Sequence, residues 1–173
     1  AHRGAMEAGG VTAGVIGAGL AYQMTARLAC LVREVAQTGC VVSPFNMTYP
    51  ASRGTFPARN RVISGMAHAC LVVEAGARSG ALVTSAFAEE QNRDVFAVPG
   101  DINRPTSAGT NALIYDGARP VIGARTFLEE LAAAGVPVKL PSRREAEQAH
   151  GLRPVDAAVL EAVQCDTSFE DIH

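Results

Sequence analysis

The chain has 173 residues, of which 48% are hydrophobic, 18% are charged and only 5% are aromatic. This length allows one well-buried domain with a small appendage, and the composition excludes a disordered or fibrous protein. The formal net charge is −2, so any contact with nucleic acid has to come from a local cluster of basic residues.

Short apolar segments bounded by turn residues recur along the chain, with helical patterns between them. Their apolarity is continuous rather than alternating, which is typical of strands in a parallel sheet that is covered on both faces. The order of strands and helices predicts an α/β fold, Rossmann-like and doubly wound, with a mainly parallel sheet. The five expected strands are residues 11–16, 40–43, 71–74, 94–98 and 119–122.

Helices are expected between these strands. Residues 25–38 carry one apolar stripe and are followed by Gly39, a residue that commonly ends helices. A second helix should begin at Pro57, with Met66 on its inward stripe and with Arg59 and Arg61 off that stripe. The other expected helices are residues 79–91, 110–115 and 126–134, and residues 1–8 have the composition of the end of a helix.

The last part of the chain differs in composition from the rest. Residues 141–153 are polar and charged without apolar periodicity, which predicts a linker between a Rossmann-like domain over residues 1–140 and a second module. Residues 154–173 read as the start of a helical module that stops before it is complete, and residues 1–140 as a domain that lacks its N-terminal part.

Composition and spacing also bear on compartment and cofactors. No segment is long and apolar enough to span a membrane. The four cysteines lie far apart, without the spacing of a metal site or a disulfide framework, so buried and reduced thiols in a cytoplasmic protein are expected. We expect no cofactor and no metal.

The first glycine loop, Gly17-Ala-Gly19, is a partial dinucleotide-binding pattern in which Tyr22 replaces the third glycine. That glycine normally allows a helix to pack closely on a strand, and no suitably placed acidic residue follows the next strand to bind a ribose hydroxyl. We therefore expect these glycines to let the chain turn above a strand rather than to bind a dinucleotide.

The loop after the third strand is a stronger candidate, because small residues lead through Arg78, Ser79 and Gly80 into a helix. A helix N-terminus presents backbone N–H groups and the positive end of a dipole, which together bind anions. An alternative stays open at this point, in which Ser79 is an ordinary N-cap and Arg78 a solvated loop charge.

Arg59, Asn60 and Arg61 place two guanidiniums and an amide within one helical turn. They form either a solvated helix face or, if they converge with the Ser79 loop, a clamp on a nucleic-acid backbone. Gly109 and Asn111 follow the fourth strand, where small polar residues cap a helix, line a crevice, or do both. Three such loops at one sheet edge would form a single groove.

No Ser or Cys nucleophile comes with a plausible His partner, so no catalytic residue is assigned and the protein is not expected to be an enzyme. His68, at the end of an apolar helix, is expected to be a capping or semi-buried residue.

Four motifs in order and spacing resemble the DprA/Smf DNA-processing family over about residues 1–118. They are FPxRNRVISG from residue 56, VVEAxxRSGxLVT from residue 72, VFAVPG from residue 95 and SxGTNxLI from residue 107. The resemblance implies a homodimeric protein that binds single-stranded DNA, protects it during natural transformation and helps to load the RecA recombinase.

The resemblance also suggests roles for individual residues. Arg59, Asn60 and Arg61 would form the basic rim of the DNA site, Arg78, Ser79 and Gly80 its phosphate loop, and Gly109 and Asn111 further contacts. The upstream family segments are missing here. Residues 154–173 resemble the start of a winged-helix tail, but they carry acidic residues without Lys or Arg, which favours a protein contact over DNA.

Two other functions compete with DNA binding. The first is a nucleoside-monophosphate phosphoribohydrolase of the related lysine-decarboxylase-like group, whose Pro-Gly-Gly-x-Gly-Thr loop and catalytic Glu are replaced here by residues 76–81 with Val83 and Thr84 after them. The second is an interaction scaffold that has lost its DNA contacts.

Overall fold

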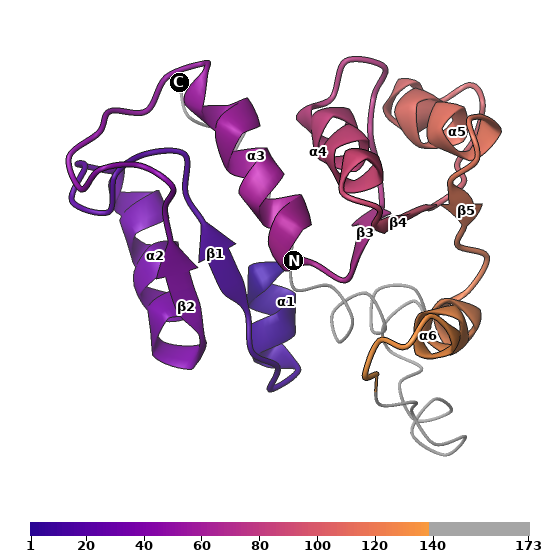
Figure 1. Cartoon of the computed structure of the whole chain (residues 1–173), viewed down its shortest axis with the longest axis horizontal. Coiled ribbons are helices and arrows are strands. Elements are labelled where there is room, and N and C mark those ends of the chain that lie inside the picture. The colour runs from indigo at the N-terminus through magenta and orange to yellow at the C-terminus, as the bar shows by residue number, and fades with distance from the viewer. Residues whose placement is uncertain (139–173) are drawn as a thin grey trace.

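The computed structural model describes residues 1–138, and the expected linker and C-terminal module lie outside them. Strands and helices alternate along the chain (Figure 1). The strands are β1 (Ala13–Val15), β2 (Cys40–Val42), β3 (Ala69–Val72), β4 (Asp94–Ala97) and β5 (Arg119–Pro120). The helices are α1 (His2–Glu7), α2 (Ala26–Thr38), α3 (Thr55–Met66), α4 (Gly80–Glu90), the 3-10 helix η1 (Pro105–Ser107), α5 (Ala108–Tyr115) and α6 (Ala124–Ala133).

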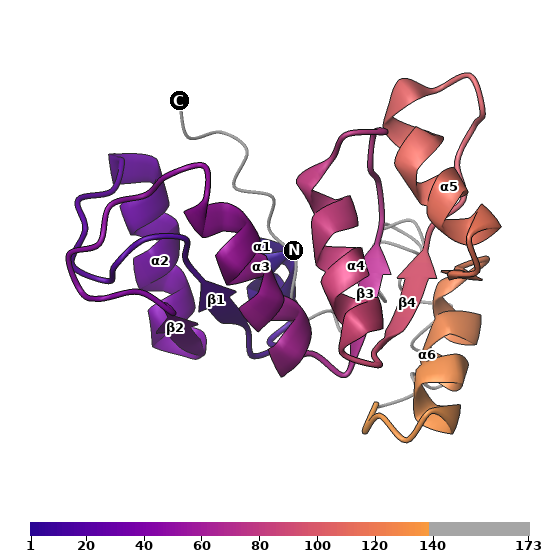
Figure 2. The same cartoon turned by 45° about the horizontal axis from the view of Figure 1, so that its top comes forward.

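Every strand pair is parallel, which confirms the prediction of a Rossmann-like α/β fold with parallel strands. The strands fall into two sheets, β1-β2 and β3-β4-β5. Within residues 1–138 no hydrogen-bonded ladder joins β1 to β3. Helix α3 lies between the two sheets in both views (Figures 1 and 2). The single continuous sheet that the sequence suggested is therefore divided between β1 and β3.

Strands β3 and β4 of the larger sheet are buried on both faces, which explains why they are mainly apolar, whereas both residues of β5 are exposed. On one face, Cys70, Val72, Val95 and Ala97 belong to a cluster with residues of α4 and α5. On the other face, Leu71 and Phe96 pack with Phe127 and Leu131 of α6, and the rings of Phe96 and Phe127 meet edge to face with centroids 5.0 Å apart.

The smaller sheet is covered less completely. Val35 of α2 is buried and its Cγ1 atom lies 3.5 Å from the position that a Cβ would take at Gly14 of β1. The three residues of β2 stay partly or fully exposed. The expectation of strands covered on both faces thus holds for β3 and β4 and is wrong for β2.

Local sequence signals set the limits of several helices. Thr25 caps α2 by accepting a hydrogen bond from the backbone N–H of Leu28, and Gly39 follows the last helical residue, as expected. Helix α3 begins at Thr55, two residues before the predicted start. Pro57 still falls in the first turn, where its missing N–H has no helical partner to lose.

The inward stripe of α3 differs from the expected one. Thr55, Arg59 and Ile63 are buried and follow one another at intervals of four residues, which places them on one face of the helix. Met66 is 51% exposed rather than inward. The prediction that Arg59 lies off the stripe is therefore wrong, and a guanidinium occupies the middle of the buried face.

Candidate nucleic-acid interface

Parallel strands end on the same side of the molecule, so the loops that follow them share one edge, which we call the carboxyl edge. It consists of residues 16–25 after β1, 43–54 after β2, 73–79 after β3 and 98–107 after β4. Helices α3 and α4 both begin there, at the upper side of Figure 1. In open α/β folds ligands bind at this edge.

The Ser79 loop lies at the carboxyl edge as predicted. Ser79 has extended backbone and its Oγ accepts a hydrogen bond of 3.3 Å from the N–H of Ala81, so it is the N-cap of α4. Its own N–H donates to the carbonyl of Gly76, which closes the preceding turn. Arg78 is exposed beside it. The positive end of the α4 dipole and the Arg78 guanidinium thus meet at one place.

Gly109 and Asn111 also lie at the carboxyl edge, where their hydrogen bonds connect the start of α5 to the loops after β3 and β4. Both polar atoms of the Asn111 side chain bind the backbone of Gly100, Oδ1 accepting at 3.1 Å and Nδ2 donating at 2.9 Å. The N–H of Gly109 donates to the carbonyl of Ala75, and a Cβ at Gly109 would lie 2.6 Å from the carbonyl oxygen of Gly76. These residues fix the shape of the edge.

Arg59 lies inside the protein, only 4% exposed. Its Nη1 donates a 2.7 Å hydrogen bond to the carbonyl of Val15, at the end of β1, and its Nε donates to Oδ1 of Asn60 at 2.9 Å. Burying a guanidinium is costly unless hydrogen bonds replace its water, and these bonds supply that replacement. In this structure Arg59 and Asn60 therefore support β1 rather than form an exposed basic rim.

Arg61 is exposed but lies far from the Ser79 loop. Its Nη1 is 3.0 Å from Oε2 of Glu90, the last residue of α4, and its guanidinium stands over the ring of Phe87. An eleven-residue helix is about 16 Å long, so Arg61 and Ser79 are placed at opposite ends of α4. The expected convergence of Arg59 and Arg61 with the Ser79 loop is not found.

Two arginines that the sequence reasoning missed do lie at the carboxyl edge. Arg53 is exposed in the loop after β2, just before α3, and Arg104 is exposed in the loop after β4, just before η1. Together with Arg78, they give each of three successive strand-to-helix loops one exposed guanidinium. The signal was the position of each arginine directly before a helix that follows a strand, rather than the density of basic residues.

A carboxylate holds Arg104 near the neighbouring loop. Oε1 of Glu74 lies 3.6 Å from Nε of Arg104 and accepts a short hydrogen bond from Oγ1 of Thr106. Glu74 follows the end of β3, so this contact connects the loops after β3 and β4. Both members of the ion pair are more than half exposed, and the attraction between them is correspondingly weak.

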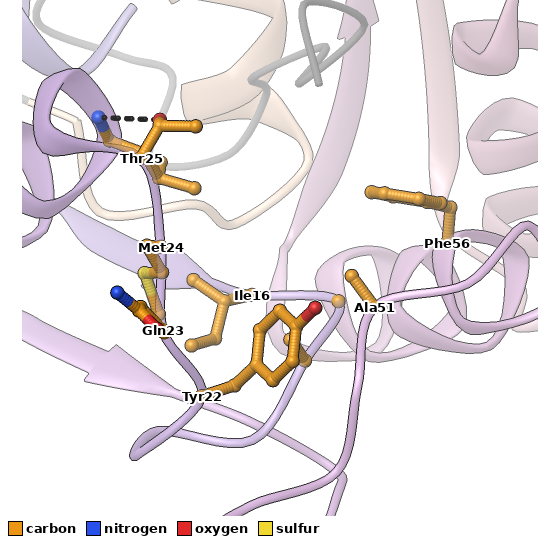
Figure 3. A pocket seen from close by; sticks show the side chains of 10 residues that line it. Ile16, Tyr22, Gln23, Met24, Thr25, Ala51 and Phe56 are labelled. Atoms are coloured by element: carbon orange, nitrogen blue, oxygen red, sulfur yellow. Dashed lines mark hydrogen bonds between the residues drawn. The ribbon is translucent and has the colours of Figure 1, made fainter. Parts of the chain in front are cut away.

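The glycine loop after β1 packs against the loop after β2. Gly19 N–H donates to the carbonyl of Tyr49 at 2.8 Å, and Ala21 N–H donates to that of Met47 at 2.7 Å. A Cβ at Gly19 would lie 2.2 Å from the carbonyl oxygens of Asn46 and Met47. The backbones approach so closely that only glycine fits, which supports the structural interpretation of this loop. Beside it lies a cavity of about 300 Å³ (Figure 3).

Residues 1–138 contain neither a candidate metal site nor a candidate membrane-spanning helix. No group of three or more His, Cys, Asp or Glu side chains in that range is placed to hold a metal ion. None of the helices in the same range combines the length and the apolarity that crossing a bilayer requires.

Comparison with known proteins identifies relatives over most of the chain. Residues 1–132 match the family model described as DNA recombination-mediator protein A. Protein Smf of Escherichia coli K12 is 45% identical over 134 residues, and DNA processing protein DprA of Streptococcus pneumoniae is 38% identical over 130 residues. These alignments cover 76% and 75% of this chain.

Solved structures agree with the fold. The X-ray structure of DNA processing protein A from Streptococcus pneumoniae matches with a TM-score of 0.60 and 37% identity, covering 69% of this chain and 42% of that one. DNA processing protein A from Helicobacter pylori, described with its single-stranded-DNA binding mode, matches with a TM-score of 0.64 and 24% identity, covering 70% and 56%. At 24% identity the second likeness establishes the fold alone.

The chain spans only part of these relatives. It covers 35% of the length of the Escherichia coli protein and 46% of the Streptococcus pneumoniae protein.

Proposed function

The chain belongs to the DNA recombination-mediator protein A family, and on that premise we propose that its carboxyl edge binds the phosphate backbone of single-stranded DNA. Arg78, Ser79 and Gly80 form the centre of the proposed contact. Arg53 and Arg104 extend it on either side, along the loops after β2 and β4. Gly109 and Asn111 keep the loops after β3 and β4 in register.

The observation that carries this proposal is the placement of one exposed arginine in each of three successive loops at a helix N-terminus. Guanidiniums bind phosphate oxygens through pairs of N–H donors, and α4 adds the positive end of its dipole. A row of such donors fits a chain of regularly spaced phosphates better than one small anion. Backbone contacts of this kind position a strand without reading its sequence.

The wider role that we propose follows from family membership. In this role the protein protects single-stranded DNA during natural transformation and helps to load the RecA recombinase, as a homodimer in the cytoplasm. The matching family model, which describes a recombination mediator, supports this role. The proposed action is binding rather than catalysis, and residues 1–138 contribute the DNA contact.

A salt titration of the 173-residue chain tests the proposal. Fluorescence anisotropy with a labelled single-stranded oligonucleotide is recorded at several salt concentrations. Three arginine–phosphate contacts on a single strand predict a slope of about −2 for the logarithm of affinity against the logarithm of salt. Oligothymidine and a mixed sequence should bind alike. A slope near zero, or no binding, would reject the proposal.

The same preparation also tests the competing function, that of a nucleoside-monophosphate phosphoribohydrolase. It is incubated with purine and pyrimidine monophosphates, and the release of free base is measured by chromatography. Release of base would favour the phosphoribohydrolase, whereas DNA binding without release favours the proposed role.

A further inference from the structure

The carboxyl edge carries acidic as well as basic side chains. Its four loops contain three arginines, Arg53, Arg78 and Arg104, and two acidic residues, Glu74 and Asp101, all of them exposed. A carboxylate repels phosphate, so an acidic side chain on a surface that binds a nucleic-acid backbone weakens the binding. Each of the two carboxylates therefore needs a reason to be there, and their contacts differ.

Asp101 shapes its own loop. Its Oδ1 accepts hydrogen bonds from the backbone N–H of Asn103 at 2.8 Å and from the side-chain amide of the same residue at 3.2 Å. An Asp side chain that binds the backbone two residues ahead stabilises a turn. The presence of Asp101 is thus explained by the turn at the start of the loop after β4.

Glu74 contacts a residue of the proposed DNA site. Its Oε1 accepts a short hydrogen bond from the hydroxyl of Thr106 and lies 3.6 Å from Nε of Arg104. A charge-assisted bond between a guanidinium and a carboxylate is ordinarily about 2.7–2.9 Å long, so the contact with Arg104 is the looser of the two. The carboxylate is therefore anchored by Thr106, and the guanidinium beside it is free to move away.

Arg104 is able to exchange the carboxylate for another anion. Its side chain is 69% exposed, so a phosphate reaches it from solvent. An exposed ion pair contributes little to stability, and a phosphate offers the guanidinium two parallel hydrogen bonds in return. Glu74 stays in place when Arg104 turns to a phosphate, because Thr106 holds it. Its negative charge then opposes the bound strand and attracts the guanidinium back.

We propose that Glu74 competes with the DNA backbone for Arg104, and so limits how long the strand stays bound. This proposal rests on the proposed function and adds to it a residue that sets the affinity of the contact. The carboxylate takes the place of a phosphate at Arg104 when no strand is present. A contact that is readily broken suits a protein that passes its strand to a partner, as the proposed mediator role requires.

The test uses Glu74→Gln, which removes the charge and keeps an oxygen that accepts from the Thr106 hydroxyl. Binding of labelled oligothymidine to the 173-residue chain is followed by anisotropy at about 0.1 M salt. The affinity should rise about fivefold, the effect of one like charge a few ångströms away in water. Dissociation, timed by stopped-flow competition with unlabelled strand, should slow by about the same factor.

A double-mutant cycle shows whether Glu74 acts through Arg104. In an Arg104→Ala background, Glu74→Gln should change the affinity by less than about twofold, because no guanidinium is left to compete for. Asp101→Asn is the matched control, since it removes the same charge from the same edge but from a carboxylate that binds Asn103. It should also change the affinity by less than about twofold.

The possible outcomes separate this inference from the proposed function. Unchanged or weaker binding by Glu74→Gln would overturn the inference and leave the phosphate contact in place. A gain that persists without Arg104, or that Asp101→Asn reproduces, would reflect only the loss of negative charge and would overturn it as well. Absence of DNA binding by wild type and by all the variants would overturn the proposed function and this inference together.

Discussion

Nη1 of Arg59 donates a 2.7 Å hydrogen bond to the carbonyl oxygen of Val15, which lies 44 positions earlier in the chain. The bond connects the middle of α3 to the end of β1, on the side where β1 has no strand partner within residues 1–138. The guanidinium therefore satisfies a backbone carbonyl that a neighbouring strand would otherwise satisfy.

Replacing Arg59 should destabilise the protein. Arg59→Leu removes a buried donor from the Val15 carbonyl and should lower the free energy of unfolding by about 1–3 kcal/mol in a urea titration. Arg61→Leu is the matched control, because it breaks an exposed ion pair and should cost less than about 1 kcal/mol. Equal losses from the two variants would contradict the structural role of Arg59.

Arg78 should contribute one phosphate contact. Arg78→Ala should weaken binding of single-stranded DNA and make the salt slope less steep by about 0.7, the share of one phosphate. The control is Arg33→Ala, at an exposed position in the middle of α2. An unchanged slope in the Arg78 variant, measured by anisotropy, would remove Arg78 from the site.

Gly19 should tolerate no side chain. The Cβ of Gly19→Ala would collide with the carbonyl oxygens of Asn46 and Met47, and the forced separation of the two loops should cost about 1–3 kcal/mol. Gly54→Ala is the control, because a Cβ there meets nothing within 4 Å. Thermal unfolding followed by circular dichroism should show a lower midpoint for the first variant only.

Asn111 should stabilise the protein by holding the loop after β4 in place. Asn111→Ala loses both hydrogen bonds to Gly100 and should lower the free energy of unfolding by about 1 kcal/mol per bond. Asn103→Ala, which loses only exposed local bonds to Asp101, should change it less. If urea titrations gave the same small change for both variants, the Asn111 bonds would not stabilise the loop.

His2 should make stability depend on pH. It is buried with Nδ1 2.7 Å from Oγ1 of Thr12, and burial lowers its pKa, helped by the positive N-terminus and Arg59. Below about pH 6.5 the unfolded chain binds a proton that the folded chain resists, so stability should fall as the pH drops from that value towards the lowered pKa.

The measurement is the difference in thermal midpoint between pH 7.5 and pH 5. His2→Gln should make this difference smaller, because the variant has no imidazole to protonate. His68 is exposed, so the expectation that it is semi-buried is wrong, and its replacement by Gln is the matched control, which should leave the difference as it is in wild type. A difference that is the same in wild type and in His2→Gln would show that His2 is not responsible.

The sequence predicts those features of the fold that depend on nearby residues. Thr25 and Ser79 identify helix starts because an N-cap bonds to the backbone two or three residues ahead. The continuous apolar runs indicate β3 and β4, because both of their faces are buried, although β3 begins and ends two residues before the predicted range 71–74.

Features that depend on distant residues were missed. The burial of Arg59 is decided by a carbonyl on another strand, so the helical pattern around it gives no sign of it. The closely spaced arginines at residues 59 and 61 predicted a basic rim there, whereas the exposed arginines at the carboxyl edge are spread over 52 positions, from Arg53 to Arg104. Their common placement appears only when the strands are aligned in parallel.

The absence of a hydrogen-bonded ladder between β1 and β3, within residues 1–138, affects how the two sheets separate. Helix α3 contacts β1 on one side and α4 on the other, so its side chains connect the smaller sheet to the larger one. Separating the two sheets breaks side-chain contacts but no strand ladder, so its free-energy cost is smaller than that of global unfolding. The smaller sheet is the part that thermal fluctuation detaches first, and the amide protons of β2 will exchange with solvent before those of β4.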